Sequence, residues 1–383
     1  MNELWRPQHT TSAMTAASPG RPRSIVFLGT AHDDGGSSVL ASTLAGAMRA
    51  GGHHVEEWYL FGSKVELPPG ARVFVKGARS RSPFTLAALF VRVVLALRRL
   101  KPNAVFGLQP LSNLLAGIAG WLARVPDRVA THHLSVAQFN PVLMTLDGWA
   151  GRFGLYRHIV ACGRSVADTY RHNGPAYMRR LTVISNGHRR PVPIDRAKAR
   201  AGFGLPATGP VLGQLGRLYH QKNQCFSIGL LHDLSDASLL MIGNGPDEAL
   251  VKSTIASRGY EGRAHVVRHI AHDRIGDFYS AIDIALFPSS FEGLSLAAIE
   301  AIHAGVPLVC SDIPSFREMF QDSPFLAAKL VVPLGERAAW LDRIRAILRD
   351  EELRIRIVAE LRRLSPAFAF ETMAAKYLAL LDR

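Results

Sequence analysis

The chain has 383 residues, of which 48% are hydrophobic and 20% charged, so it can form two domains with substantial cores. Its formal net charge of +14 predicts anionic partners, yet no zinc-finger or basic-aromatic RNA-binding pattern is present, which argues against nucleic acid. The wide spacing of Cys162, Cys225 and Cys310 argues against a disulfide framework and a CxxC metal site. Cysteines without a disulfide framework fit a reducing cytoplasm, so we expect a cytoplasmic protein, and no apolar run reaches the length of a membrane span.

The first ordered elements predict a strand, a helix and a second strand. Ser24–Gly29 is a short apolar run, and Ser37–Ala50 carries its apolar residues at helical spacing. Val55–Tyr59 predicts the next strand. Gly35 and Gly36 lie directly before the helix, where glycines allow a ligand to approach the backbone N–H groups. We therefore expect both glycines to border a binding site.

A long basic segment, residues 71–126, contains no Asp or Glu. Within it Pro83–Leu100 predicts a helix that combines apolar bulk with arginines. One interpretation is that this segment contacts an anionic membrane surface, which would make the protein peripheral at the inner face of the membrane. The other is a helix packed on its sheet with the arginines directed to solvent. The cations of the segment are Arg72, Lys76, Arg79, Arg81, Arg92, Arg98, Arg99, Lys101 and Arg124.

Strands and helices continue to alternate, which predicts a parallel, doubly wound sheet. The elements expected here are strands at 104–108, 128–131, 158–161 and 182–184 and a helix at 111–123. His132 and His133 follow one of these strands, at the end where open α/β sheets bind ligands. Adjacent strand residues point to opposite faces, so one of the two histidines should enter a cleft, and we favour His133.

Two stretches without alternating apolar strands and helices divide the chain. Residues 1–22 are polar and lack the apolar core of a signal peptide, which predicts a disordered leader. The stretch 187–210 is rich in proline and basic residues and predicts the boundary between two α/β units. The final residues, from about 338, predict Arg-rich helices with Pro366 as a kink point.

Charged residues of the second unit gather after predicted strands. Arg217 ends the strand pattern 211–217, and Lys222 follows it, so that two cations could neutralise a diphosphate. A second strand pattern leads into a glycine-containing loop and a helix from about Ser295 to Ala304. Glu292 lies before this helix and Glu300 within it. Backbone amides at the start of a helix can bind phosphates, and carboxylates can bind hydroxyls. Together these groups suit a sugar nucleotide as ligand.

In order and spacing these motifs resemble those of the retaining GT-B glycosyltransferases of family 4. Glu292 and Glu300 meet the Glu-x7-Glu motif of that family, and the resemblance is strong over residues 211–318. It implies two Rossmann-like doubly wound domains that face a cleft. An N-terminal acceptor-binding domain would span 23–190, a C-terminal nucleotide-sugar-binding domain 191–365, and a helix at 366–383 would cross back. The other motifs that carry the resemblance are 243–246, 281–283 and 304–312.

The resemblance also implies roles for individual residues. Arg217 and Lys222 would bind the donor diphosphate, Glu300 the ribose, and Glu292 and His133 the transferred sugar, and the catalytic set would be Glu292, Arg217, Lys222 and His133. Arg268 replaces a glycine common in the family, beside Ile270 in the loop that meets the base. The expected substrate-binding residues are Gly35, Gly36, His132, Ile270, Gly293, Leu294, Ser295, Leu296 and Glu300. No cofactor and no metal are implied.

The expected function is retaining, metal-independent sugar transfer from a nucleotide sugar, with UDP-sugars as the first candidate donors. The acceptor would be a glycan or a polyprenyl-linked lipid in cell-surface polysaccharide synthesis, such as exopolysaccharide or lipopolysaccharide. Two alternatives stay open. One is a nucleotide-sugar epimerase of the same fold, and the other is a non-catalytic protein that binds sugar nucleotides. The sequence does not encode the sugar, the acceptor or the oligomeric state.

Overall fold

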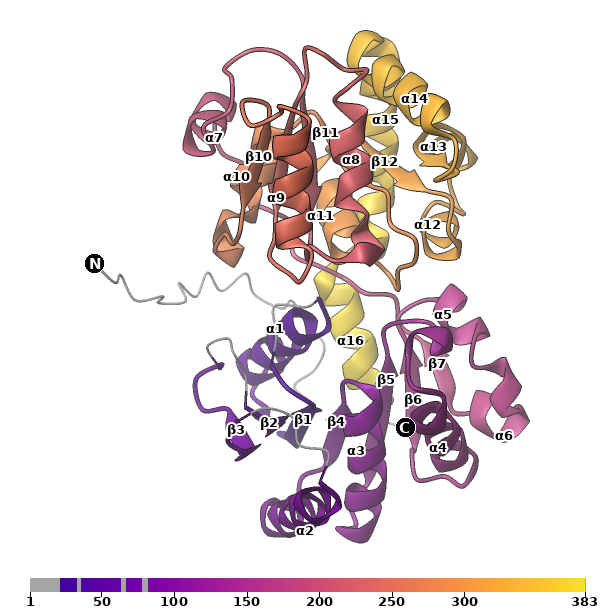
Figure 1. Cartoon of the computed structure of the whole chain (residues 1–383). Coiled ribbons are helices and arrows are strands. Elements are labelled where there is room, and N and C mark those ends of the chain that lie inside the picture. The colour runs from indigo at the N-terminus through magenta and orange to yellow at the C-terminus, as the bar shows by residue number, and fades with distance from the viewer. Residues whose placement is uncertain (1–20, 33–35, 63–66, 78–81, 383) are drawn as a thin grey trace.

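A computed structural model describes residues 21–32, 36–62, 67–77 and 82–382. It contains two parallel sheets, one above the other in Figure 1, each with helices on both faces. This confirms the predicted pair of Rossmann-like doubly wound domains. The first sheet has the order β3-β2-β1-β4-β5-β6-β7, and its strands are β1 (Ser24–Gly29), β2 (His54–Phe61), β3 (Arg72–Val75), β4 (Ala104–Gly107), β5 (Asp127–His132), β6 (His158–Ala161) and β7 (Leu181–Val183).

The second sheet has the order β10-β9-β8-β11-β12-β13. Its strands are β8 (Val211–Leu215), β9 (Ser238–Ile242), β10 (Ala264–Val267), β11 (Ile284–Phe287), β12 (Leu308–Ser311) and β13 (Val331–Val332). Central strands of both sheets are mostly apolar, because helices cover both of their faces.

Helices of the first half cover the two faces of the first sheet. α1 packs on one face, in a cluster that includes Phe27 and Phe106, while α2 and α3 pack on the other, around Val26 and Val105. No helix of the described residues is long and apolar enough to cross a membrane. These helices are α1 (Gly36–Ala50), α2 (Pro83–Leu100), α3 (Pro110–Leu122), α4 (Pro141–Arg152), α5 (Arg164–Asp168) and α6 (Pro175–Met178).

The last helix packs against the first domain, although the helices directly before it in the chain pack against the second. After α15 a short 3-10 turn at Ser365–Phe368 leads into α16. The buried residues Phe370, Met373 and Tyr377 of α16 join the cluster of the first sheet, and the phenyl ring of Phe106 lies 6.1 Å from the Tyr377 ring. α16 therefore holds the two halves together, as its position below α15 in Figure 1 shows.

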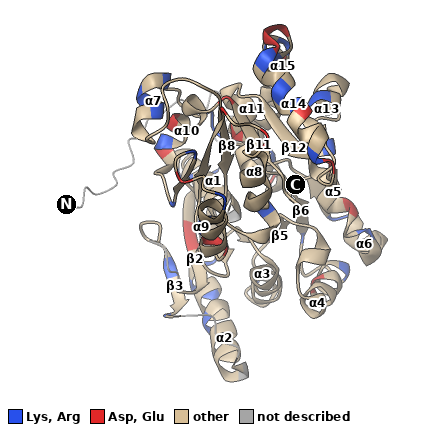
Figure 2. Cartoon of the chain, turned by 45° about the horizontal axis from the view of Figure 1, so that its top comes forward, with Lys and Arg blue, Asp and Glu red and all other residues tan. Residues whose placement is uncertain are grey.

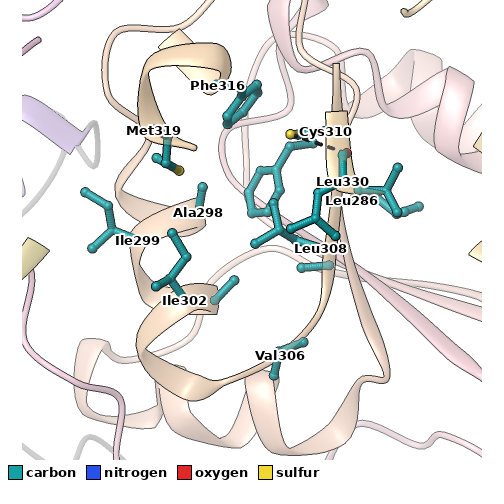
Figure 3. Packing of buried hydrophobic residues seen from close by; sticks show 14 of the residues in the cluster. Leu286, Ala298, Ile299, Ile302, Val306, Leu308, Cys310, Phe316, Met319 and Leu330 are labelled. Carbon is teal, nitrogen blue, oxygen red and sulfur yellow. Dashed lines mark hydrogen bonds between the residues drawn. The ribbon is translucent and has the colours of Figure 1, made fainter. Parts of the chain in front are cut away.

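The helices of the second half surround the second sheet. Figure 3 shows how α11 is fixed: Ala298 and Ile302 lie on the side of the helix that faces Leu308 of β12, and all three belong to one buried cluster with Phe316 of α12. Burying each large aliphatic side chain of this kind contributes about 1.5–3 kcal/mol. The helices are α7 (Arg196–Gly202), α8 (Gln224–Leu230), α9 (Glu248–Ser257), α10 (Ile275–Ala281), α11 (Leu296–Ala304), α12 (Pro314–Met319), α13 (Pro324–Leu330), α14 (Arg337–Arg349), α15 (Glu351–Leu364) and α16 (Phe370–Leu380).

The elements predicted by residue range agree with the structure, whereas several others, among them β3 and α7, were not predicted. The helix predicted at Pro83–Leu100 is α2, and the helix predicted from about Ser295 begins at Leu296 with Ser295 as its N-cap. Sequence analysis missed β3, a four-residue edge strand in the basic segment. It also missed α7, which lies inside the stretch 187–210 and begins after Asp195, whose side chain accepts a hydrogen bond from the Lys198 N–H.

Candidate functional site

The loop before α11 presents an acidic side chain, and α11 presents its N-terminus, to the space between the two sheets. Ser295 caps α11, its hydroxyl oxygen accepting a 3.4 Å hydrogen bond from the Ala298 N–H. Because the apolar residues of α11 fix the helix on β12, its N-terminus is directed at the cleft. The partial positive charge there favours an anion.

Glu292 is almost fully buried, with 7% of its side chain exposed, and both oxygens of its carboxylate have partners. Lys222 Nζ forms an ion pair with Oε1. The Ser289 hydroxyl donates to the same oxygen at 2.8 Å, and Gln221 Nε2 donates to Oε2 at 3.3 Å. Lys222 and Glu292 are therefore in direct contact, 70 residues apart in the chain.

Arg217 and Lys222 lie on the loop that follows β8, and two glutamines hold its backbone. Gln224 Nε2 donates to the Arg217 carbonyl at 2.8 Å, and Gln214 Nε2 donates to the Lys222 carbonyl at 2.7 Å. Arg217 is exposed, and its guanidinium lies 6.0 Å from the centre of the Tyr219 ring. The fixed backbone keeps both cations at the strand ends.

The start of this loop packs tightly on the loop after β9. A Cβ added to Gly243 would lie 2.0 Å from the Gly216 carbonyl oxygen, so a side chain does not fit there. Gly216 also has a φ of +144°, a conformation that favours glycine. The Gly243-Asn244-Gly245-Pro246 motif is thus required for the close approach of two loops at the cleft.

Glu300 is buried on α11, facing Tyr279 and His188. The Tyr279 hydroxyl lies 3.2 Å from Oε2, and His188 Nδ1 lies 3.4 Å from Oε1. Burial raises the pKa of Glu300 to about 8, and burial lowers the pKa of His188 to about 4. At neutral pH the two side chains are therefore both uncharged.

The two histidines after β5 have different environments. His133 lines the cleft and its Nε2 lies 3.2 Å from the Thr131 hydroxyl oxygen. Thr131 donates its own proton to the Gly107 carbonyl at 2.7 Å, so His133 Nε2 carries a proton and donates. Burial, with a smaller contribution from His132, lowers the pKa of His133 to about 4. His133 is therefore a neutral hydrogen-bonding group.

His132 faces the interior of the first domain, which corrects its prediction as a substrate-binding residue. Its side chain is 1% exposed, its Nε2 lies 2.8 Å from the Tyr177 hydroxyl, and its ring stacks on Tyr170 at 4.1 Å. Asp147 accepts hydrogen bonds from Tyr177 and Tyr156. The strand alternation that sends His133 into the cleft thus sends His132 into a buried polar cluster.

The two domains touch where β5 ends and α11 begins. Asn186 Nδ2 donates to the Leu294 carbonyl at 2.9 Å. Glu318 of α12 accepts hydrogen bonds from the Arg164 N–H at 2.6 Å and from the Ser165 N–H at 2.7 Å, at the start of α5. The second domain is therefore held against the first by hydrogen bonds between side chains and backbone groups.

A cleft of about 2210 Å³ lies between the domains. It brings together these predicted site residues: Gly36, His133, Arg217, Lys222, Ile270, Glu292, Gly293, Leu294, Ser295, Leu296 and Glu300. Gly35 lies outside the described residues. The Leu296 side chain reaches across to Gly36, where a Cβ would lie 3.3 Å from it. One cleft therefore joins the N-terminus of α1 to the N-terminus of α11.

Sequence analysis missed three cleft residues that contact predicted ones: Asn186, His188 and Gln221. The Asn186-Gly187 pair has the pattern of a structural turn, although Asn186 also lines the cleft. Gln221 directly precedes Lys222, and that adjacency to a predicted cation was the available signal. No local pattern marks His188, whose partner Glu300 is more than 100 residues away.

Comparisons with known proteins agree with this geometry. Residues 195–363 match the family model of glycosyl transferases group 1, and residues 34–189 match that of Glycosyltransferase Family 4. The chain belongs to family 4 of the GT-B glycosyltransferases. This glycosyltransferase is 26% identical over 384 residues to a D-inositol 3-phosphate glycosyltransferase of Xylanimonas cellulosilytica, a match that covers 90% of this chain and 91% of the relative.

Another relative and a solved structure extend the comparison. A 2-deoxystreptamine glucosyltransferase of Streptomyces kanamyceticus is 29% identical over 217 residues, which is 51% of this glycosyltransferase. The match spans 55% of that relative's length. The structure of Anabaena HepE in complex with UDP and glucose superimposes with a TM-score of 0.80 at 18% identity, covering 94% of this chain and 99% of HepE. This likeness shows that the fold is shared.

Proposed function

We propose that this glycosyltransferase transfers a sugar from a UDP-sugar to a glycan or lipid-linked acceptor, with retention of anomeric configuration and without a metal. The observation that carries the proposal is the meeting of Lys222, Glu292 and the N-terminus of α11 in one cleft. HepE, which shares the fold, is described in complexes with UDP and with UDP-glucose, which supports a uridine nucleotide.

The donor diphosphate would lie against the backbone at the N-terminus of α11, between Arg217 and Lys222. Lys222 forms an ion pair with Glu292, and a diphosphate would become a second anionic partner. Glu292 would then be free to accept hydrogen bonds from hydroxyls of the sugar. A carboxylate held by Lys222, Ser289 and Gln221 is oriented for that contact.

Glu300 would bind the ribose. Its carboxyl is protonated at neutral pH, since burial raises its pKa to about 8. Two ribose hydroxyls that donate to it would favour the ionised form and lower that pKa. Binding of the nucleotide would therefore release a proton from this side chain near neutral pH.

In the transfer step the bond between the anomeric carbon and the diphosphate oxygen breaks, and the acceptor oxygen bonds to the same carbon on the same face. The proton of the acceptor hydroxyl passes to the leaving phosphate. Arg217 and Lys222 stabilise the charge that develops on that phosphate. Neutral His133 would accept a hydrogen bond from a sugar hydroxyl, because its Nε2–H is already engaged by Thr131 and its other ring nitrogen is an acceptor.

The experiment is a panel of nucleotide sugars, read by thermal shift and by nucleotide release. Release would be measured alone, with a bacterial membrane lipid extract, and with D-inositol 3-phosphate or 2-deoxystreptamine. We expect one UDP-sugar to stabilise the protein and to be consumed only when an acceptor is present. Formation of an epimer without acceptor would instead indicate an epimerase, and stabilisation by no nucleotide sugar would refute the donor site.

A further inference from the structure

The outer face of the first domain exposes an unusual concentration of large apolar side chains. α3 packs on α2 and on α4, so the three helices form one continuous surface in the lower half of Figure 1. Single exposed apolar residues are ordinary, but a contiguous patch marks a binding surface. Most of the exposed large hydrophobic residues among the described ones lie here: Phe84, Val91, Leu95, Ile118, Trp121, Leu122, Val142, Leu146, Trp149 and Phe153.

An arginine-lined pocket of about 830 Å³ lies at one edge of this surface. α3 and α4 end there, just before β5 and β6 begin. The pocket therefore lies at the N-terminal ends of these strands, whereas the cleft lies at their C-terminal ends. The lining includes Arg128, Arg152, Arg157, Arg179 and Arg180, together with His158. We call this the arginine pocket. Arg157 Nε contacts the Asp127 carboxylate at 3.2 Å.

Backbone carbonyls hold part of the arginine pocket in place. Arg128 Nε donates to the Leu155 carbonyl at 2.8 Å, and Arg152 Nε donates to the Asn173 carbonyl at 2.6 Å. Arg180 Nε is buried and has no hydrogen-bond partner within the described part of the chain. Several fixed guanidinium groups with few acids between them favour an anion with several oxygens, such as a phosphate.

Further cations lie at the ends of the neighbouring helices, close to the N-terminal ends of the strands. α2 ends in Arg98 and Arg99, and Lys101 caps it, while Arg124 follows α3. No Asp or Glu occurs from residue 71 to 126, and α2 in Figure 2 accordingly carries blue and no red residues. Positive charge therefore continues from the arginine pocket along the ends of three helices.

We propose that the α3–α4 face and the arginine pocket together dock on an anionic lipid bilayer, with headgroup phosphates in the pocket. Trp121 and Trp149, which are 56% and 55% exposed, would lie at the level of the headgroups, where an indole has both an apolar and a polar environment. A second copy of the chain is a poorer occupant, because its formal net charge of +14 complements the cationic edge less well than an anionic bilayer does. This site includes residues outside the basic segment 71–126. The proposal does not depend on the proposed sugar transfer.

Vesicle co-sedimentation tests the proposal with the full chain. We expect sedimentation with phosphatidylglycerol vesicles, none with phosphatidylcholine vesicles, and steep loss as salt rises. Arg179→Glu combined with Arg180→Glu should lower the partition coefficient by more than about tenfold. Trp149→Ala should lower it severalfold. Matched controls on the second domain, Arg349→Glu and Ile355→Ala, should leave it unchanged.

Arg179 is exposed, so the single Arg179→Glu variant serves if the double variant does not fold; its circular dichroism and melting temperature should match those of the wild type. Equal sedimentation with neutral and anionic vesicles, or no effect of either arginine variant, would overturn the proposal. Stabilisation by inorganic phosphate without sedimentation on phosphatidylglycerol would overturn the lipid assignment and indicate a soluble phosphate as ligand.

Discussion

The backbone of Gly293 lies against the carbonyl oxygen of His133, so close that a Cβ on Gly293 would be 1.8 Å from that oxygen. Gly293 belongs to the loop before α11 in the second domain, and His133 follows β5 in the first. The contact therefore brings the loop that carries Glu292 next to the segment that carries His133. At this contact the distance between the two domains determines how far the loop before α11 lies from His133.

Gly293→Ala should prevent this approach, because the methyl group and the His133 carbonyl oxygen cannot occupy the same space. We expect turnover of the donor to fall roughly 100-fold, the effect of a displacement of about 1 Å at a reacting centre. Steady-state kinetics checks this. Gly335→Ala is the control, since no atom lies within 4 Å of the Cβ it would add. Wild-type turnover in Gly293→Ala would mean that the domains react in another arrangement.

Lys222→Ala removes a cation that we place at the leaving phosphate. The loss of one such electrostatic contact costs about 100- to 1000-fold in kcat. Lys252→Ala is a matched control, because Lys252 forms a comparable 2.8 Å ion pair with Glu248 on α9, outside the cleft lining. Equal kcat in the two variants would remove Lys222 from the proposed mechanism.

Glu300 makes stability depend on pH. Burial raises the pKa of Glu300 from an ordinary 4.5 to about 8, so between these values the folded protein holds one more proton than the unfolded chain. Stability must then fall as pH rises through that window. Glu300→Gln cannot titrate, so the melting temperature of the variant should fall less steeply over the window than that of the wild type. Parallel curves for wild type, Glu300→Gln and the exposed control Glu352→Gln would show that the Glu300 pKa is ordinary.

Glu318 joins the domains at the side of the cleft where α12 meets α5. Glu318→Ala leaves the Arg164 and Ser165 N–H groups without their carboxylate partner, and it should lower the free energy of unfolding by about 1–3 kcal/mol. Urea unfolding of the variant checks the value, with Glu261→Ala on an exposed loop as control. A change within error of the control would show that the contact does not hold the domains.

His132 and His133 should separate stability from activity, although they are neighbours in the chain. His132→Ala removes a buried ring stacked on Tyr170 and bonded to Tyr177, and should cost about 2 kcal/mol or more. His133→Ala should change stability little and lower turnover. Thermal melts and kinetics of both variants distinguish the roles, and a reversed pattern would exchange the two assignments.

Local patterns predicted the elements that carry the site, but not the contacts between them. The apolar runs indicated that α11 begins near Ser295, and strand alternation indicated that only one of His132 and His133 enters the cleft, without deciding which. The pairing of Glu318 with α5 could not be predicted, because it joins residues more than 150 positions apart. The same holds for His188 beside Glu300 and for the arginine pocket, whose members come from the ends of several helices and strands that only the fold brings together.

The crystal structure of a complex with UDP would test the central claim most directly. The account predicts the diphosphate within hydrogen-bond distance of Lys222 and the N-terminus of α11, and both ribose hydroxyls on the Glu300 carboxylate. UDP bound with its ribose away from Glu300, or outside the cleft between the two domains, would contradict the proposed donor site.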